Sequence, residues 1–163
     1  LDVPVPFITR VFLSVLGFIA KLRGTLDSYA PSDPPARTPE KPNENWVTYD
    51  EERYDRGEAL LHHDTDLQVN GRSLGWTVSA LKIMKNTARP ENLKSIDCPI
   101  FFAMAEHEHL VKNSAIEQAM QYLPNVNYKV YPNARHELFM ELNETRDAFI
   151  NDIDEFFMKS DEA

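Results

Sequence analysis

Two short polar segments of the sequence carry residues that could do acid–base chemistry. His136 lies in the segment Tyr131–Leu138, between a strand-like run and a helical pattern. Glu108 lies in the segment Ala105–His109, which also follows a strand-like run. A histidine can take a proton from a hydroxyl nucleophile and return it to the leaving group, while a carboxylate holds the imidazole in one tautomer. The two segments therefore indicate the base and the acid of a catalytic triad.

Two predicted strands would position these residues. The nearly continuous apolar run Cys98–Met104 is typical of a strand covered on both faces of a parallel sheet. The run Val126–Val130 alternates apolar and polar residues, which predicts a strand with one wetter face. Because parallel sheets place functional groups in the loops beyond the carboxyl ends of their strands, we expect Glu108 and His136 to lie within reach of each other.

Helical patterns follow each predicted strand. Asn113–Leu123 predicts the first helix, with Ser114 and Glu117 as a capping box and Pro124 as its stop. Leu138–Phe157 predicts a last helical region, and Asn143 could cap its second part. A strand–helix–strand–helix order predicts parallel strands. Because two strands alone are not a stable sheet, we expect the rest of the sheet to come from a longer parent protein.

The longest apolar segment precedes both strands, at Phe7–Leu22. Its apolar residues follow helical spacing, at positions 8, 11, 12, 15, 16, 19 and 22, and Gly24 ends the pattern. The segment is too short and too interrupted by basic residues to span a membrane. We expect a buried helix; the alternative is a lid helix that presents an apolar face to a lipid-like substrate.

The remaining patterns divide the chain into two predicted parts. Thr48–Leu61 and Trp76–Lys85 are helical, and five prolines make residues 31–45 an extended loop. We therefore expect a helical cap or lid region at residues 1–90, with the Pro-rich loop at 31–45. Residues 91–163 form the predicted strand–helix–strand–helix core.

Composition excludes some functions. The chain has 163 residues, is 42% hydrophobic and carries a net charge of −9, which argues against nucleic-acid binding. An anionic membrane would repel it on average, although a local patch could still dock. Cys98 is the single cysteine, which fits a reducing compartment, so we expect a cytoplasmic protein with room for peripheral membrane contact. Because the sequence begins at Leu1, we interpret its start as an internal point of a longer chain.

Two alternative sites can be read from the sequence. Gly71–Gly75 matches the motif G-x-S-x-G, which would make Ser73 a nucleophile. However, the preceding Asp64–Asn70 is too polar for the buried strand that the motif requires, so we interpret Ser73 as a decoy. A metal site is the other alternative, and its ligands would come from Glu106, His107, Glu108, His109 and His136. Their spacing matches no recognised zinc motif, so we expect no metal and no cofactor.

Several segments resemble one enzyme family. Pro99–Asn113 resembles the acid-bearing strand and turn of lysophospholipase-like α/β-hydrolases, a family that includes monoacylglycerol-lipase relatives. Tyr131–Glu141, with Arg146, is similar to the histidine turn and final helix of that family. Thr48–Tyr54 and Gly71–Trp76 resemble its cap and cap-return segments.

The resemblance implies the fold and the site residues. The fold would be the C-terminal part of an α/β-hydrolase, with the last two parallel strands, their flanking helices and a helical cap. His136 would be the catalytic histidine and Glu108 the acid, where the family usually has Asp; Glu106 competes for that role. The nucleophilic serine would lie upstream of Leu1, and Ser73 would lie in the cap-return segment, away from the chemistry.

The resemblance also implies a function. The chain would be the C-terminal half of a serine ester hydrolase acting on single-chain lipid esters, of the lysophospholipase or monoacylglycerol-lipase type. Its partners would be the lipid ester and the N-terminal half of the same hydrolase, so the isolated chain would be inactive. The alternative is a non-catalytic binding module on a degenerate hydrolase fold. The presence of Glu108 where the family usually has Asp favours this alternative.

Overall fold

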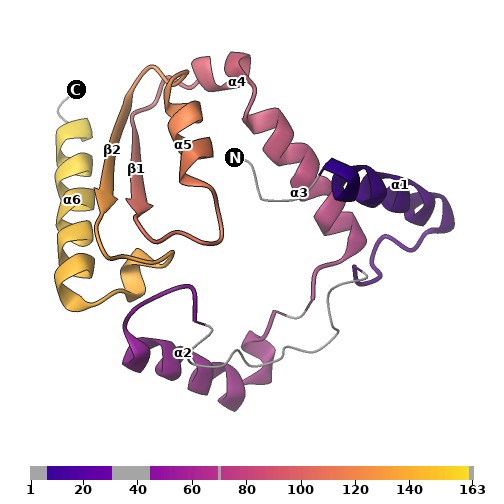
Figure 1. The fold of residues 1–163 in the computed structure, drawn as a ribbon, viewed down its shortest axis with the longest axis horizontal. Coiled ribbons are helices and arrows are strands. Elements are labelled where there is room, and N and C mark those ends of the chain that lie inside the picture. Colours follow the sequence, from indigo (N-terminus) through magenta and orange to yellow (C-terminus); the bar gives the residue numbers. More distant parts are fainter. Residues whose placement is uncertain (1–6, 31–44, 70, 162–163) are drawn as a thin grey trace.

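The computed structural model describes residues 7–30, 45–69 and 71–161 (Figure 1). The predicted loop at 31–45 lies outside this range except for Asn45. The elements are the helices α1 (Phe7–Arg23), α2 (Glu51–His63), α3 (Leu74–Thr87), α4 (Pro90–Lys94), α5 (Asn113–Met120) and α6 (Asn143–Asp161), the 3₁₀ helices η2 (Thr65–Leu67) and η3 (Leu138–Met140), and the strands β1 (Ile100–Ala105) and β2 (Val126–Tyr131).

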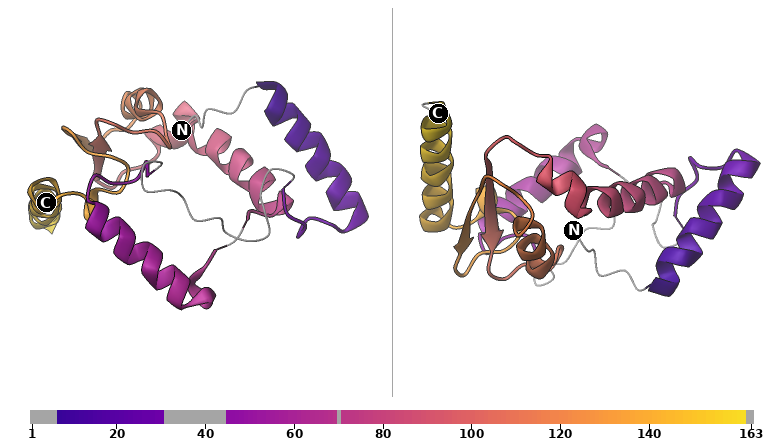
Figure 2. Two further views of the ribbon diagram at one scale, coloured as in Figure 1. Left: turned by 60° about the horizontal axis from the view of Figure 1, so that its bottom comes forward. Right: turned by 90° about the horizontal axis from the view of Figure 1, so that it is seen from above.

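The two strands form a parallel pair, as predicted. Ile100 lies opposite Val126, and Ala105 lies opposite Tyr131 at the carboxyl end. Helix α5 connects the strands, and α5 and α6 lie on opposite sides of the pair (Figures 1 and 2). In the described part of the chain β1 has β2 as its one neighbour, so its other edge is open.

The main hydrophobic core lies at the carboxyl ends of the strands. Its buried residues come from both strand ends, the turn after β2 and helix α6: Ala105, Tyr131, Ala134, Leu138 and Phe149. The Tyr131 hydroxyl donates to Asp152 of α6 at 2.6 Å, and Lys129 donates to the same oxygen at 2.6 Å. Burial opposes ionisation of Asp152, but these two bonds outweigh it and lower its pKa. Packing and a charged hydrogen bond thus fix the end of β2 against α6.

Helix α1 packs against α3 through small residues and the partly buried Leu16, while most of its bulky stripe is exposed. Its buried positions include Gly17 and Ala20, and a methyl group on Gly17 would overlap the Val78 side chain of α3. Gly24 ends the helix with φ +67°, and the Thr25 N–H donates to the Ala20 carbonyl as in a Schellman cap. The bulky residues are exposed: Ile8, Val11, Phe12, Val15, Phe18, Ile19 and Leu22. The prediction of a buried helix is therefore wrong, because close approach at Gly17 selects the opposite face.

Two local predictions are also wrong. Helix α5 has Lys112 as its N-cap, without a side-chain capping bond, so the Ser114–Glu117 capping box does not form. Instead Asn113 donates its side-chain N–H to the Ala105 carbonyl at 2.8 Å, which ties the start of α5 to the end of β1. Asn143 is the first residue of α6, and its side-chain oxygen accepts from Arg53. In both cases a tertiary partner replaces the predicted local one.

The other helical patterns agree with the structure within a few residues. Thr48–Leu61 corresponds to α2 and Trp76–Lys85 to α3, whereas the short helix α4 was not predicted. None of the helices in the described residues is long and apolar enough to cross a membrane. The predicted division near residue 90 falls at the start of α4 and stays a prediction.

Candidate active site

The carboxyl ends of β1 and β2 bring His136 and Glu108 together. His136 Nδ1 lies 2.7 Å from Glu108 Oε2, and the side chains are 31% and 6% exposed. Because an ionised carboxylate only accepts hydrogen bonds, Nδ1 carries the proton of this bond. A neutral His136 then keeps Nε2 free to accept a proton from a hydroxyl group.

Two further bonds hold the Glu108 carboxylate in place. Its other oxygen, Oε1, accepts from the backbone N–H of Leu110 at 2.6 Å and of Val111 at 3.2 Å. Burial opposes ionisation of Glu108, but the bonds from His136 and these two N–H groups outweigh it and lower its pKa. The carboxylate is therefore ionised at neutral pH and held between its own turn and the histidine.

Glu106 has a different partner. Its carboxylate accepts from the Asn133 N–H at 2.9 Å, and its side chain is half exposed. Asn133 has φ +50°, a left-handed conformation that asparagine tolerates. The choice between Glu106 and Glu108 was open in the sequence; the geometry brings Glu108 to His136, while its catalytic role stays a prediction.

The other histidines of the acid turn contact aromatic residues. His107 Nδ1 lies 2.8 Å from the Tyr49 hydroxyl, and the His109 ring lies 4.8 Å from the Trp46 ring. Within residues 7–30, 45–69 and 71–161, no three His, Cys, Asp or Glu side chains gather as a metal site. The alternative metal site therefore has no geometric support in the described turn.

Ser73 serves as a helix cap in this structure. Its hydroxyl accepts from the Trp76 N–H at 3.1 Å as N-cap of α3, with extended backbone angles. The only pairing there is an isolated antiparallel bridge to Tyr29, so among the described residues no buried strand leads into Ser73. A nucleophile elbow requires a strained strand-to-helix turn. The geometry agrees with the interpretation of Ser73 as a decoy.

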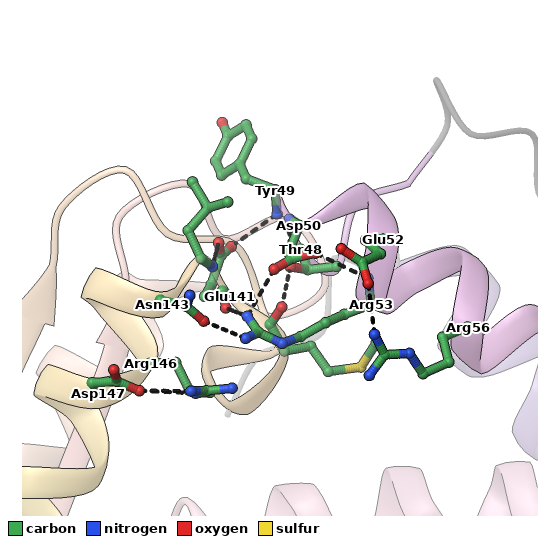
Figure 3. Close-up of polar contacts among 12 residues, drawn as sticks. Thr48, Tyr49, Asp50, Glu52, Arg53, Arg56, Glu141, Asn143, Arg146 and Asp147 are labelled. Carbon is green, nitrogen blue, oxygen red and sulfur yellow. Dashed lines mark hydrogen bonds and ion pairs between the residues drawn. The ribbon is translucent and has the colours of Figure 1, made fainter.

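Sequence reasoning missed the segment that contacts both turns. Residues 45–53, hereafter the strap, include the first residues of α2. Figure 3 shows Thr48, Tyr49 and Arg53 of the strap beside Glu141 and Asn143. Glu141, which has no exposed side-chain surface, accepts from the backbone N–H of strap residue Tyr49. The sequence gives no signal for this contact, because Glu141 sits in a stretch typical of surface helix and its partner is about 90 residues away.

The ends of the two neighbouring strands thus bring a histidine and a carboxylate into contact. Residues 4–143 match the family described as serine aminopeptidase, S33. The chain belongs to this family.

Other proteins are similar to this chain in sequence or in fold. The chain is 27% identical over 90 residues to a probable lysophospholipase L2 of Haemophilus influenzae, covering 55% of this chain and 28% of that protein. A monoglyceride lipase of Saccharomyces cerevisiae, solved with a substrate analogue, matches 94% of this chain with a TM-score of 0.61 and 17% identity. A monoacylglycerol lipase of Paleococcus ferrophilus matches 98% of this chain with a TM-score of 0.67 and 13% identity.

A thermostable carboxyl esterase of Bacillus coagulans shares the fold too, with a TM-score of 0.63, 16% identity and 94% of this chain covered. The chain spans about half of each solved structure, at 50%, 55% and 53% of their lengths. The predicted fold class, a part of an α/β-hydrolase with two parallel strands and flanking helices, is confirmed. So is the resemblance to lysophospholipases and monoacylglycerol lipases.

Proposed function

We propose that this chain supplies the base, His136, and the acid, Glu108, of a serine carboxylic-ester hydrolase. The nucleophilic serine and its oxyanion hole would come from an N-terminal half of the same hydrolase. The observation that carries the proposal is the 2.7 Å hydrogen bond between His136 and Glu108. The exposure of the imidazole supports it further, because a base must meet its nucleophile.

The proposed reaction is acyl transfer through the serine. As the serine oxygen attacks the ester carbonyl, His136 Nε2 takes the hydroxyl proton, and Glu108 stabilises the resulting imidazolium. The C–O bond to the alcohol then breaks, and the imidazolium gives its proton to the leaving oxygen. A water molecule attacks the acyl-enzyme in the same way, releasing the acid and restoring the serine hydroxyl.

The open edge of β1 supports the need for a second half. The side chains of β1 are mostly partly buried, and β1 has one neighbouring strand among the described residues. The backbone groups of its other edge are therefore available for pairing. The N-terminal half would add its strands there. We therefore expect the isolated chain to be inactive.

Single-chain lipid esters are the proposed substrates. The relatives are named as lysophospholipase and monoglyceride lipase, and the exposed apolar stripe of α1 offers hydrocarbon contact. The sequence of α1 has three basic residues and no acidic one, although the whole chain carries a net charge of −9. An apolar face with basic residues on one helix is typical of contact with a lipid surface. The family description names an aminopeptidase, and the same proton transfers would serve an amide; the exposed apolar stripe of α1 favours the lipid ester.

A single pair of variants tests the proposal in the complete protein. His136→Ala should lower the rate of ester hydrolysis by orders of magnitude, while a serine-reactive phosphonate should label a serine outside residues 1–163. His62→Ala is the matched control, because His62 is an exposed residue in the last turn of α2. A binding module would instead keep its ligand affinity in His136→Ala, whereas full ester hydrolysis by this variant would refute His136 as the base. Labelling of Ser73 would overturn its interpretation as a decoy.

A further inference from the structure

We infer that the strap is a positioning element that keeps the side chains of His136 and Glu108 at hydrogen-bonding distance, with Tyr49 as its central residue. This inference rests on the proposed function, since positioning matters only if the pair does chemistry. The strap contacts the sequence neighbours of both residues of the pair. It touches Arg135 and Glu137 on either side of His136, and His107 and His109 on either side of Glu108.

On the histidine side, the contacts fix the backbone before and after residue 136. The Glu137 N–H donates to the Val47 carbonyl at 2.8 Å. The Arg135 guanidinium donates to the carbonyls of Asn45 and Thr48 at 2.5 and 3.1 Å, and lies 3.9 Å above the Tyr49 ring. Two neighbours of the imidazole are therefore held by the same short segment.

On the acid side, aromatic residues of the strap fix the turn that carries Glu108. The Tyr49 hydroxyl bonds to His107 Nδ1 at 2.8 Å, and the Trp46 ring packs at a tilt on His109. Tyr49 thus contacts both turns at once, through its hydroxyl on one side and its ring face on the other. A movement of this residue would change the separation of the two turns.

Glu141 is hydrogen-bonded to the strap (Figure 3). Its carboxylate accepts three backbone N–H groups, from Tyr49 at 3.2 Å, Arg135 at 2.7 Å and Leu142 at 3.2 Å. Arg53 of the strap donates to the Glu141 carbonyl and to Asn143. Because the Glu141 side chain is fully buried, its carboxylate depends on these donors and holds the three segments together.

Small displacements of such a pair have large effects. His136 and Glu108 lie on separate loops, so their bond depends on how the loops are placed relative to each other. A misplacement of about 1 Å costs on the order of 100-fold in rate in oriented active sites. The strap supplies contacts that join the loops beyond the strand ends.

Variants of Tyr49 in the complete protein test this inference. Tyr49→Ala should lower kcat for a soluble short-chain ester about 10- to 100-fold and leave KM within about twofold. Tyr49→Phe keeps the ring under Arg135 and removes only the bond to His107, so kcat should fall about 3- to 10-fold. Tyr128→Ala is the control, because Tyr128 is an exposed tyrosine of β2, and its kcat should not change.

A second readout does not depend on activity. The ¹⁵N chemical shifts of the His136 imidazole, assigned with His136→Ala, report which ring nitrogen carries the proton. Tyr49→Ala should convert a single Nδ1–H form into a mixture. Should this variant fail to fold, Tyr49→Phe decides alone. Wild-type kcat and wild-type imidazole shifts in the folded Tyr49 variants would overturn the inference. An active His136→Ala would refute the proposed function instead, and the imidazole shifts would still test the strap.

Discussion

Replacing Glu108 by glutamine changes the charge of the proposed acid and little else. The two side chains have the same length, so the new carbonyl oxygen could still accept from the N–H groups of Leu110 and Val111, which lie 2.6 and 3.2 Å from Oε1. The amide nitrogen would then face His136 Nδ1, where it donates and cannot accept. The imidazole proton would move to Nε2, which is the nitrogen that must take the serine proton.

The expected loss follows from this change of tautomer. In a serine–histidine–acid site the equivalent change lowers kcat by about 10⁴-fold. At about 1.36 kcal/mol for each factor of ten, this is about 5 kcal/mol of transition-state stabilisation. The folded state loses one charge-assisted hydrogen bond to a partly exposed histidine, about 1 kcal/mol. Glu108→Gln should therefore be folded and nearly inactive.

The assay is steady-state hydrolysis of a soluble short-chain ester by the complete protein at neutral pH. Glu106→Gln is the matched control, because Glu106 accepts from Asn133 and does not contact His136. Its kcat should stay within about threefold of the wild type, since it touches no reacting group. Equal losses in the two variants, or a folded Glu108→Gln with more than about a tenth of the wild-type kcat, would refute the assignment of the acid.

Three further predictions concern acid stability, side-chain length and helix α1. Glu108 and Asp152 have lowered pKa values, so their stabilising contribution is present above the ordinary carboxyl pKa of about 4 and is lost as the pH falls through the lowered values. Calorimetry should show a lower Tm at pH about 3 than at pH 7, with a smaller difference in Glu108→Gln; an equal difference would contradict the pKa shift. Glu108→Asp, one methylene shorter, should lower kcat about 10- to 100-fold, and an unchanged kcat would show that the turn adjusts. The double variant Phe12→Ser, Phe18→Ser should weaken binding to anionic liposomes at least about tenfold in a sedimentation assay without lowering Tm, because both rings are exposed; a lower Tm with unchanged binding would contradict this.

Local sequence patterns predicted the parts of this fold that depend on local physics. Alternating and continuous apolar runs found β1 and β2 within two residues, and helical spacing found α1 with its glycine end. The position of Glu108 and His136 beyond parallel strands predicted their contact, because the carboxyl ends of such strands share an edge. These features need no knowledge of distant residues.

The features that were missed depend on contacts between distant segments. The local sequence does not show whether the apolar stripe of α1 is exposed or buried. The close approach of Gly17 to Val78 determines which face of the helix packs against α3. Glu141 is charged and sits before a helix, so the pattern places it on the surface, yet the strap covers it. Such burial follows from tertiary donors that compensate the carboxylate, which a single sequence does not display.

The glutamate at position 108 bears on the choice between an enzyme and a degenerate module. Glu108 stands where the resemblance leads us to expect Asp. The extra methylene of Glu108 would lengthen the side chain and add a freely rotating bond if the side chain were unrestrained. Two backbone N–H groups hold Oε1, so the rotation is already fixed and Oε2 is presented to His136 at 2.7 Å. The longer acid thus forms the same kind of pairing through a turn shaped to receive it. The exchange that best supported a binding module is, on this geometry, compatible with a working acid, so only the activity of the Glu108 and His136 variants discriminates between the two hypotheses.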